Sequence, residues 1–201
     1  MVTNYSQNNY ILLVGKVTSE KKFSHEIYGE SFYTFNLEIP RLSGVSDIIP
    51  ITISERLIAN FDLNIGKQVV IEGQFRSYNT YEDTKSRLIL TVFVKEIREK
   101  GEEEDIKVPN EVRLVGHICR KPIYRKTPFG RERNARFCED MPIGTELKLV
   151  GRVQSRPYEK KHEDGTVESR VAYEVSISSL EFVNKEENNN EEEITTTEEA
   201  M

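Results

Sequence analysis

Two tyrosines each follow an arginine by two residues, in segments whose composition predicts β-strands. The first pair is Arg76 and Tyr78, and the second is Arg156 and Tyr158. Because side chains alternate across a strand, both members of a pair are expected on the same outward face. A tyrosine ring can stack on an unpaired base, which contributes about 1–3 kcal/mol, while a neighbouring cation follows the phosphate backbone. The spacing therefore favours contact with a single-stranded nucleic acid.

Other outward aromatic and polar residues, together with many cations, extend this predicted surface. The complete set of predicted nucleic-acid contacts is Phe32, Arg41, Arg56, Gln74, Arg76, Tyr78, Tyr81, Arg87, Arg120, Lys121, Arg125, Lys126, Phe129, Arg131, Arg152, Arg156, Tyr158, Lys160 and Lys161. The alternation of apolar residues assigns Tyr33 and Phe35 to the interior instead.

No residue pattern in the chain indicates catalysis or metal binding. His25, His117 and His162 are far apart and lack carboxylate or thiolate companions at ligand spacing. The motifs GxSxG and HExxH and the phosphate-binding Walker loop do not occur. We therefore expect no enzymatic activity, no metal and no other cofactor. The two cysteines, Cys119 and Cys138, have no CxxC spacing and are expected to be free thiols in a reducing compartment.

The elements that must position the outward residues are short strands separated by turns. We expect strands at residues 10–18 (with a bend at Gly15, and continued by residues 23–28), 31–39, 48–53, 67–78 and 87–97. Ser54 is a good N-cap, so a helix of about two turns is expected after it. Five strands with one helix between the third and fourth is the order of an OB fold, a five-stranded Greek-key barrel.

The same unit recurs later in the chain. Residues 11–17 match residues 112–118 at an offset of 101, and residues 65–73 match residues 143–151 at an offset of 78. The second copy is therefore 23 residues shorter, and the deficit falls after Gly130, where the first copy has its second and third strands. Such a remnant exposes strand edges, so we expect it to need cover from the first copy or from another chain.

Several of these segments resemble the bacterial single-stranded DNA-binding protein family. Residues 115–130, VGHICRKPIYRKTPFG, are similar to the family's first strand, and residues 29–41, GESFYTFNLEIPR, are similar to its second. Residues 72–77 and 150–158 both resemble its fourth strand. The resemblance implies an OB fold, oligomeric binding of single-stranded DNA, and roles in DNA replication, recombination and repair. The chain has no Trp, the residue on which this family usually stacks bases, and offers tyrosines instead.

The predicted organisation has five parts. They are a disordered N-terminal lead (1–9), a first OB-fold domain (10–97), a charged linker (98–107), a second, truncated OB-fold domain (108–184) and an acidic disordered tail (185–201). The formal net charge of −6 resides in the tail, whereas residues 108–161 carry a local charge of +7. The tail either keeps the chain soluble, or competes with DNA and recruits replication or repair proteins.

No apolar run is long enough to span a membrane, and the N-terminus does not resemble a signal peptide. We therefore expect a cytoplasmic protein without membrane contact. The predicted function is largely sequence-independent binding of single-stranded DNA, with RNA and homo-oligomerisation left open. The alternative is an OB-fold protein-interaction adapter, primosome-like or phage-encoded, whose strand-deficient unit pairs with a partner's edge.

Overall fold

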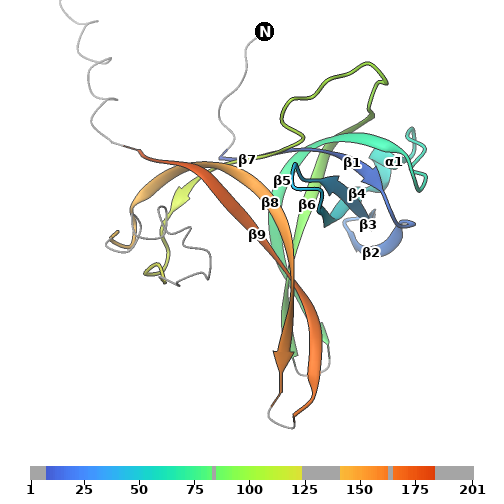
Figure 1. The fold of residues 1–201 in the computed structure, drawn as a ribbon. Helices are drawn as coiled ribbons and strands as arrows, with labels where there is room; N and C mark the ends of the chain where they lie inside the picture. The colour runs from blue at the N-terminus through green and yellow to red at the C-terminus, as the bar shows by residue number, and fades with distance from the viewer. Residues whose placement is uncertain (1–7, 83–84, 124–140, 163–164, 184–201) are drawn as a thin grey trace, which may run out of the picture. The chain divides into compact units, whose positions relative to one another are not determined.

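The computed structural model describes residues 8–82, 85–123, 141–162 and 165–183. Within these ranges the chain forms nine strands and one short helix (Figure 1). They are β1 (Asn9–Val17), β2 (Lys22–Ile27), β3 (Glu30–Pro40), β4 (Ser46–Ser54), α1 (Glu55–Ile58), β5 (Gln68–Glu82), β6 (Lys85–Glu99), β7 (Asn110–His117), β8 (Glu146–Lys161) and β9 (Val167–Phe182).

The first six strands contain a closed barrel. The sheet order is β2-β3-β4-β6-β5-β1-β7-β8-β9, and an additional pairing of β3 with β1 closes the ring β1-β3-β4-β6-β5. Strand β4 runs parallel to β6, with Ile51 opposite Val92, whereas the other four pairings of the ring are antiparallel. The five-stranded OB barrel predicted from the sequence is confirmed.

Alternating apolar residues build the barrel interior. Phe35, Leu37 and Ile39 of β3 are buried on one face of that strand, as period-two alternation requires. They pack in one cluster with buried residues of β1, β4, β5 and β6. The predicted cap is also present, because the Ser54 Oγ accepts a hydrogen bond of 3.2 Å from the backbone N–H of Arg56.

The helix is shorter than predicted. It spans four residues instead of two turns. The chain leaves it through an i to i−3 hydrogen bond of 3.1 Å, donated by the Phe61 N–H to the Ile58 carbonyl. Asn60 and Asp62 flank Phe61, and both residue types favour turns over helix interiors because their side chains compete for backbone hydrogen bonds.

Gly15 allows β1 to pair with different strands along one edge. Residues 9–13 of β1 pair with β7, whereas Lys16 and Val17 pair with β3. A Cβ atom on Gly15 would lie 2.4 Å from the carbonyl oxygen of Glu38, so only glycine allows β3 to approach this closely. The bend predicted at Gly15 therefore corresponds to the point where one strand changes partner.

The repeat in the sequence is also a repeat of hydrogen bonds. The side chain of Asn9 donates to the Phe75 carbonyl at 2.7 Å and accepts from the Phe75 N–H at 2.9 Å. The side chain of Asn110 makes the same two bonds to Val153, at 2.7 and 2.9 Å. Strand β1 pairs with β7 around Ile11 opposite Val112, two residues that are themselves equivalent at the offset of 101. The two copies thus pair through equivalent strands, as two molecules related by a two-fold axis would.

The turn that precedes the fourth barrel strand is repeated as well. In the first copy the Val17 N–H donates to the Lys67 carbonyl at 3.0 Å, and the Gly66 N–H donates to the Val17 carbonyl at 2.8 Å. In the second copy the N–H groups of Ile118 and Gly144 make the corresponding bonds, at 3.0 and 2.8 Å. The matched sequence blocks therefore adopt matched backbone geometry.

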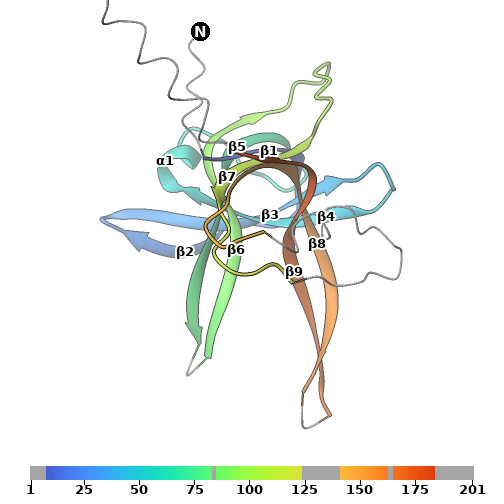
Figure 2. The same cartoon turned by 90° about the vertical axis from the view of Figure 1, so that its left-hand side faces the viewer.

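The chain divides into two compact units: residues 1–114 together with 149–179, and residues 115–148 together with 180–201. This division differs from the predicted boundary at residues 98–107. Most of β8 and β9 belongs to the first unit, where Val112 and Val153 are fully buried in the barrel's core cluster. That residues 108–184 need cover from the first copy or from another chain in order to fold remains a prediction. Strands β5 and β6 form one long hairpin and β8 and β9 another (Figure 2).

Candidate nucleic-acid interface

Four aromatic rings and one arginine form a continuous row on the outer side of the barrel, which we call the aromatic row. The rings of Tyr78 and His25 lie 6.2 Å apart, and the His25 ring stacks on Phe32 at 5.0 Å. The Phe32 ring lies 5.6 Å from that of Phe93, and the Arg76 guanidinium carbon lies 4.0 Å from the Phe93 ring centre. Strands β2, β3, β5 and β6 each contribute to the row.

The exposure of the row agrees with the sequence prediction for Tyr78 and disagrees for Phe32. Tyr78 is 37% exposed and Arg76 is also exposed. The outward exposure predicted for Phe32 is wrong, because its side chain is only 7% exposed. The ring lies outside the barrel's core cluster, as alternation predicts, but His25 and Phe93 cover it.

A hollow of about 450 Å³ adjoins one end of the row, and we call it the Phe32 hollow. Phe32 and Phe93 form its aromatic part, and Arg56 and Lys95 are among its cationic residues. A second hollow, of about 310 Å³, lies beside Tyr78 and includes Lys22, Asn36 and Thr91. Aromatic rings, cations and hollows therefore occur together on this side of the barrel.

Arg56 and Gln74, both predicted contacts, have protein partners beside the row. The Arg56 Nε donates to the Glu30 Oε1 at 2.8 Å, and the Ser54 Oγ donates to the same oxygen. The hydrogen bond from Ser54 has the larger effect, and together with the hydrogen bond from Arg56 it lowers the pKa of Glu30. The Gln74 Oε1 accepts from the Arg76 Nε at 3.0 Å and from its Nη2 at 2.5 Å. Arg56 remains 83% exposed, so its guanidinium still reaches solvent.

Arg41 is predicted to contact nucleic acid, but the structure places its guanidinium on a buried carboxylate. Its Nε and Nη2 donate to the two oxygens of Asp47 at 2.6 and 2.5 Å, and its Nη2 also reaches the Ser155 carbonyl at 3.2 Å. The Ser155 N–H donates to Asp47 at 2.6 Å. Burial alone would raise the pKa of Asp47, but the hydrogen bonds from Arg41 and Ser155 outweigh burial and hold that pKa below its usual value. Arg41, Asp47 and Ser155 thus join β4 to β8, and we call them the Asp47 clamp.

The predicted contacts on β8 are mostly exposed. Tyr158 is 38% exposed, and Lys160 and Lys161 are exposed beyond it. Arg156 is exposed too, but its Nε lies 3.4 Å from Glu174, whose carboxylate also accepts from Gln154 at 2.6 Å. Arg152 is half-buried, and Arg120 and Lys121 of the second unit are exposed.

Six predicted residues cannot be placed. The side chains of Tyr81 and Arg87, as well as all of Arg125, Lys126, Phe129 and Arg131, lie outside the described part of the structure.

Two members of the row were missed by the sequence-based prediction. Phe93 lies between the buried Val92 and Val94, so strand alternation could have identified it as outward. His25 could not be found in this way, because the pairing of β2 with β3 shifts register between Phe23 and His25. A bulge of this kind changes which side chains share a face.

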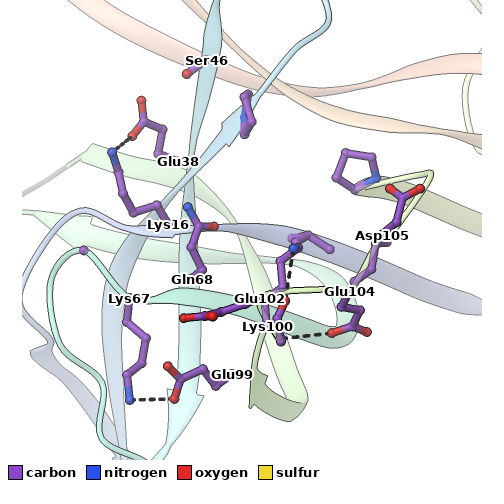
Figure 3. A pocket seen from close by; sticks show the side chains of 16 residues that line it. Lys16, Glu38, Ser46, Lys67, Gln68, Glu99, Lys100, Glu102, Glu104 and Asp105 are labelled. Atoms are coloured by element: carbon purple, nitrogen blue, oxygen red, sulfur yellow. Dashed lines mark hydrogen bonds and ion pairs between the residues drawn. The ribbon is translucent and has the colours of Figure 1, made fainter.

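A third hollow, of about 890 Å³, lies elsewhere, at the end of the barrel where β1 meets β3 and the segment after β6 (Figure 3). Its lining contains five acidic residues and three lysines. Lys16 pairs with Glu38 at 3.1 Å and Lys67 with Glu99 at 3.3 Å. The excess of carboxylates disfavours a polyanion there, so this hollow is not part of the candidate interface.

The described residues include no helix long and apolar enough to cross a membrane.

Comparison with family models and with curated proteins finds no match. Among solved structures, the single-stranded DNA-binding protein of Thermus aquaticus matches with a TM-score of 0.66 and 19% identity, covering 88% of this chain and 93% of that one. A deletion variant of the same protein matches with a TM-score of 0.67 and 18% identity, covering 91% and 98%. The dimeric N-terminal domain of PriB from Thermoanaerobacter tencongensis is 51% identical over 48% of this chain and 100% of that domain, with a TM-score of 0.42.

The closed barrel and the Thermus aquaticus matches define the chain as an all-β protein of the OB-fold class. The matches extend over about nine-tenths of the chain and therefore include strands of both copies. The likeness to the Thermus aquaticus structures is therefore a likeness of fold.

Proposed function

We propose that this protein binds single-stranded DNA, largely independently of sequence, and has no enzymatic activity. The observation that carries the proposal is the aromatic row, in which four rings and a cation lie side by side on the outer side of an OB barrel. Every base offers a π-face, so stacking on rings tolerates any sequence, and cations follow the phosphates. A coating protein of this kind would act in DNA replication, recombination or repair.

The β8–β9 hairpin supplies a second group of predicted contacts for the same strand. Tyr158, Lys160 and Lys161 are exposed on β8, and Arg56 is exposed near the row. We further propose that residues 108–184 are an incomplete OB unit whose strands serve mainly to complete the first. The burial of Val112 and Val153 in the core cluster of the barrel supports this proposal.

A salt titration tests the proposal. Binding of fluorescein-labelled oligo-dT would be measured by anisotropy at several salt concentrations. The logarithm of the affinity should fall linearly with the logarithm of salt, with a slope of about 0.7 for each phosphate neutralised. Duplex DNA of the same length should bind more weakly, because its bases are not available for stacking. If the folded protein binds no oligo-dT at low salt, the proposal is wrong and the protein-interaction adapter becomes the better account.

A matched pair of variants locates the interface. Arg76→Gln removes the cation that lies over Phe93, and we expect about a threefold to tenfold loss of oligo-dT affinity with a smaller salt slope. Arg98→Gln changes the same residue type near the end of β6, where Arg98 pairs with Glu104 at 2.6 Å. It should leave both affinity and slope nearly unchanged. Equal losses in the two variants would argue for a diffuse electrostatic attraction instead of a defined interface.

A further inference from the structure

The Phe32 hollow has the size and lining expected of a site for one base. Its volume of about 450 Å³ exceeds that of a single nucleobase and its sugar, and the rings of Phe32 and Phe93 contribute apolar surface. Arg56, Lys95 and Glu30 add both signs of charge to the lining. A groove that only needed to attract phosphates would not require a carboxylate at this point, because a carboxylate repels them.

Glu30 has one oxygen available for a ligand. Its Oε1 accepts from the Ser54 Oγ and from the Arg56 Nε. Within the described residues, no donor reaches its Oε2. The two bonds to Oε1 fix the orientation of the carboxylate, while Arg56, 83% exposed, has further guanidinium donors. The hollow therefore offers a fixed acceptor beside a cationic donor.

The four bases differ in how well their hydrogen-bonding edges match the Glu30 acceptor and the Arg56 donor. Cytosine presents an exocyclic amino group, which donates, next to a ring nitrogen and a carbonyl, which accept. Adenine and guanine also carry an amino group, whereas thymine has only carbonyl oxygens at the exocyclic positions of its pairing edge. A carboxylate accepts a hydrogen bond from an amino group and repels a carbonyl oxygen.

We propose that the Phe32 hollow is a subsite that selects an amino-bearing base over thymine within a strand that is otherwise bound without regard to sequence. Glu30 accepts from the exocyclic amino group, Arg56 donates to the neighbouring ring acceptor, and Phe32 and Phe93 contact the ring. This inference rests on the proposed binding of single-stranded DNA. It adds one position at which the protein distinguishes bases.

The test uses the full chain and a set of short oligo-dT probes that carry one different base at the centre. The central base is thymine, cytosine, adenine or 2-pyrimidinone, which is cytosine without its amino group. We expect the cytosine and adenine probes to bind about fivefold more tightly than the thymine probe, the low end of the discrimination that a specific base contact provides. The 2-pyrimidinone probe should lose this advantage, and this measurement requires no protein variant.

Glu30→Gln tests the carboxylate directly. A glutamine amide both donates and accepts, so the ratio of cytosine to thymine affinity should fall to about one, while the thymine probe binds as well as or better than before. Glu26→Gln is the matched control, because Glu26 is exposed on the same hairpin and does not line the hollow. It should keep the fivefold ratio. Thermal unfolding of each variant would verify that it is folded.

The outcomes separate this inference from the proposed function. If the thymine probe does not bind at low salt, the proposed function fails. If all probes bind within twofold of one another, or if Glu30→Gln leaves the ratio unchanged, binding stands and the base-selective subsite is wrong. A preference for cytosine that 2-pyrimidinone retains would also overturn the subsite, because the amino group would then not be recognised.

Discussion

The two copies of the repeat share a backbone framework and differ in their outer surfaces. Gly73 and Gly151 occupy equivalent positions, and a Cβ on either would lie within 2.4 Å of a carbonyl oxygen of the next strand, that of Phe93 or of Ser176. This correspondence aligns Phe93 with Ser176, just as the offset of 78 aligns Arg76 with Gln154 and Tyr78 with Arg156. The first copy thus carries the aromatic row where the second carries polar side chains.

This difference separates residues that the backbone requires from residues on the outer surface that can vary. Glycines and asparagine bridges recur because backbone atoms approach closely at those points, and a change there would leave a clash or an unsatisfied polar group. Outward positions carry no such constraint. In the second copy, Gln154 and Arg156 both contact Glu174, so their polar groups are engaged within the protein. Contact with DNA bases should therefore depend more on the first copy than on the second.

We expect the largest effect on stability from Asp47→Ala, which removes the link between β4 of the first copy and β8 of the second. This variant leaves the Arg41 guanidinium without its carboxylate and the Ser155 N–H without its acceptor, and Asp47 itself is fully buried. We expect a loss of about 3 kcal/mol in the free energy of unfolding, measured with urea. Asp62→Ala, at an exposed site, should change it by less than about 0.5 kcal/mol. A loss below about 1 kcal/mol for Asp47→Ala would show that the clamp does not hold β8 on the barrel.

The clamp also predicts a pH dependence. Because the folded-state pKa of Asp47 is depressed, its contribution to stability is fully present above the unfolded-state pKa of about 3.9 and is lost as the pH falls through the lower folded-state value. Urea midpoints measured from pH 6 down to pH 3 should therefore fall more steeply for the wild type than for Asp47→Asn. Parallel curves for the two proteins would contradict this account.

A pair of glycine substitutions sharpens the comparison between complete and incomplete copies. Gly15→Ala places a Cβ 2.4 Å from the Glu38 carbonyl oxygen, so β1 and β3 must move apart, at a cost of about 1–3 kcal/mol. Gly116 is the equivalent residue, and apart from its two neighbours in the chain, no heavy atom of the described residues lies within 4 Å of a Cβ built there. Gly116→Ala should therefore be close to neutral in urea unfolding. A large loss for Gly116→Ala would show that a strand equivalent to β3 covers this site.

The asparagine bridges should be equally important in the two copies. Asn9→Ala and Asn110→Ala each remove two hydrogen bonds to a strand backbone, and each should cost about 1–2 kcal/mol. The measurement is again urea unfolding, and the two losses should agree within about 0.5 kcal/mol. A loss confined to Asn9→Ala would mean that the second copy contributes little to the cooperative unit.

The smallest expected effect concerns the two tyrosines. Tyr78→Ala should weaken oligo-dT binding about tenfold, which corresponds to the loss of one stacked base. Tyr158→Ala should weaken it by about twofold to threefold, since the aromatic row lies on the first copy, beside Tyr78. Anisotropy titrations of both variants at one salt concentration would make the comparison. A larger loss for Tyr158→Ala would assign the main stacking surface to the second copy.

Much of the fold could be predicted because it depends on local patterns. Alternation identified the strands of the barrel, and Gly15 and the N-cap at Ser54 were recognised by residue type. The errors have a common physical cause. Phe32 is covered by His25 only because of a bulge in β2, and Arg41 is held by Asp47, which in turn accepts from Ser155, 108 residues further along the chain. Long-range pairs of this kind leave no periodic signal in one sequence.

The pairing of β1 with β7 makes assembly of the two copies a unimolecular event. Two separate barrels would dissociate on dilution, whereas a tethered second copy faces the first at an effective concentration in the millimolar range. Strand β5 pairs with one edge of β1, and strands β3 and β7 pair with the other. A further molecule would therefore have to associate through another strand. The joined state should therefore persist at the nanomolar concentrations at which a scarce DNA-binding protein would have to work.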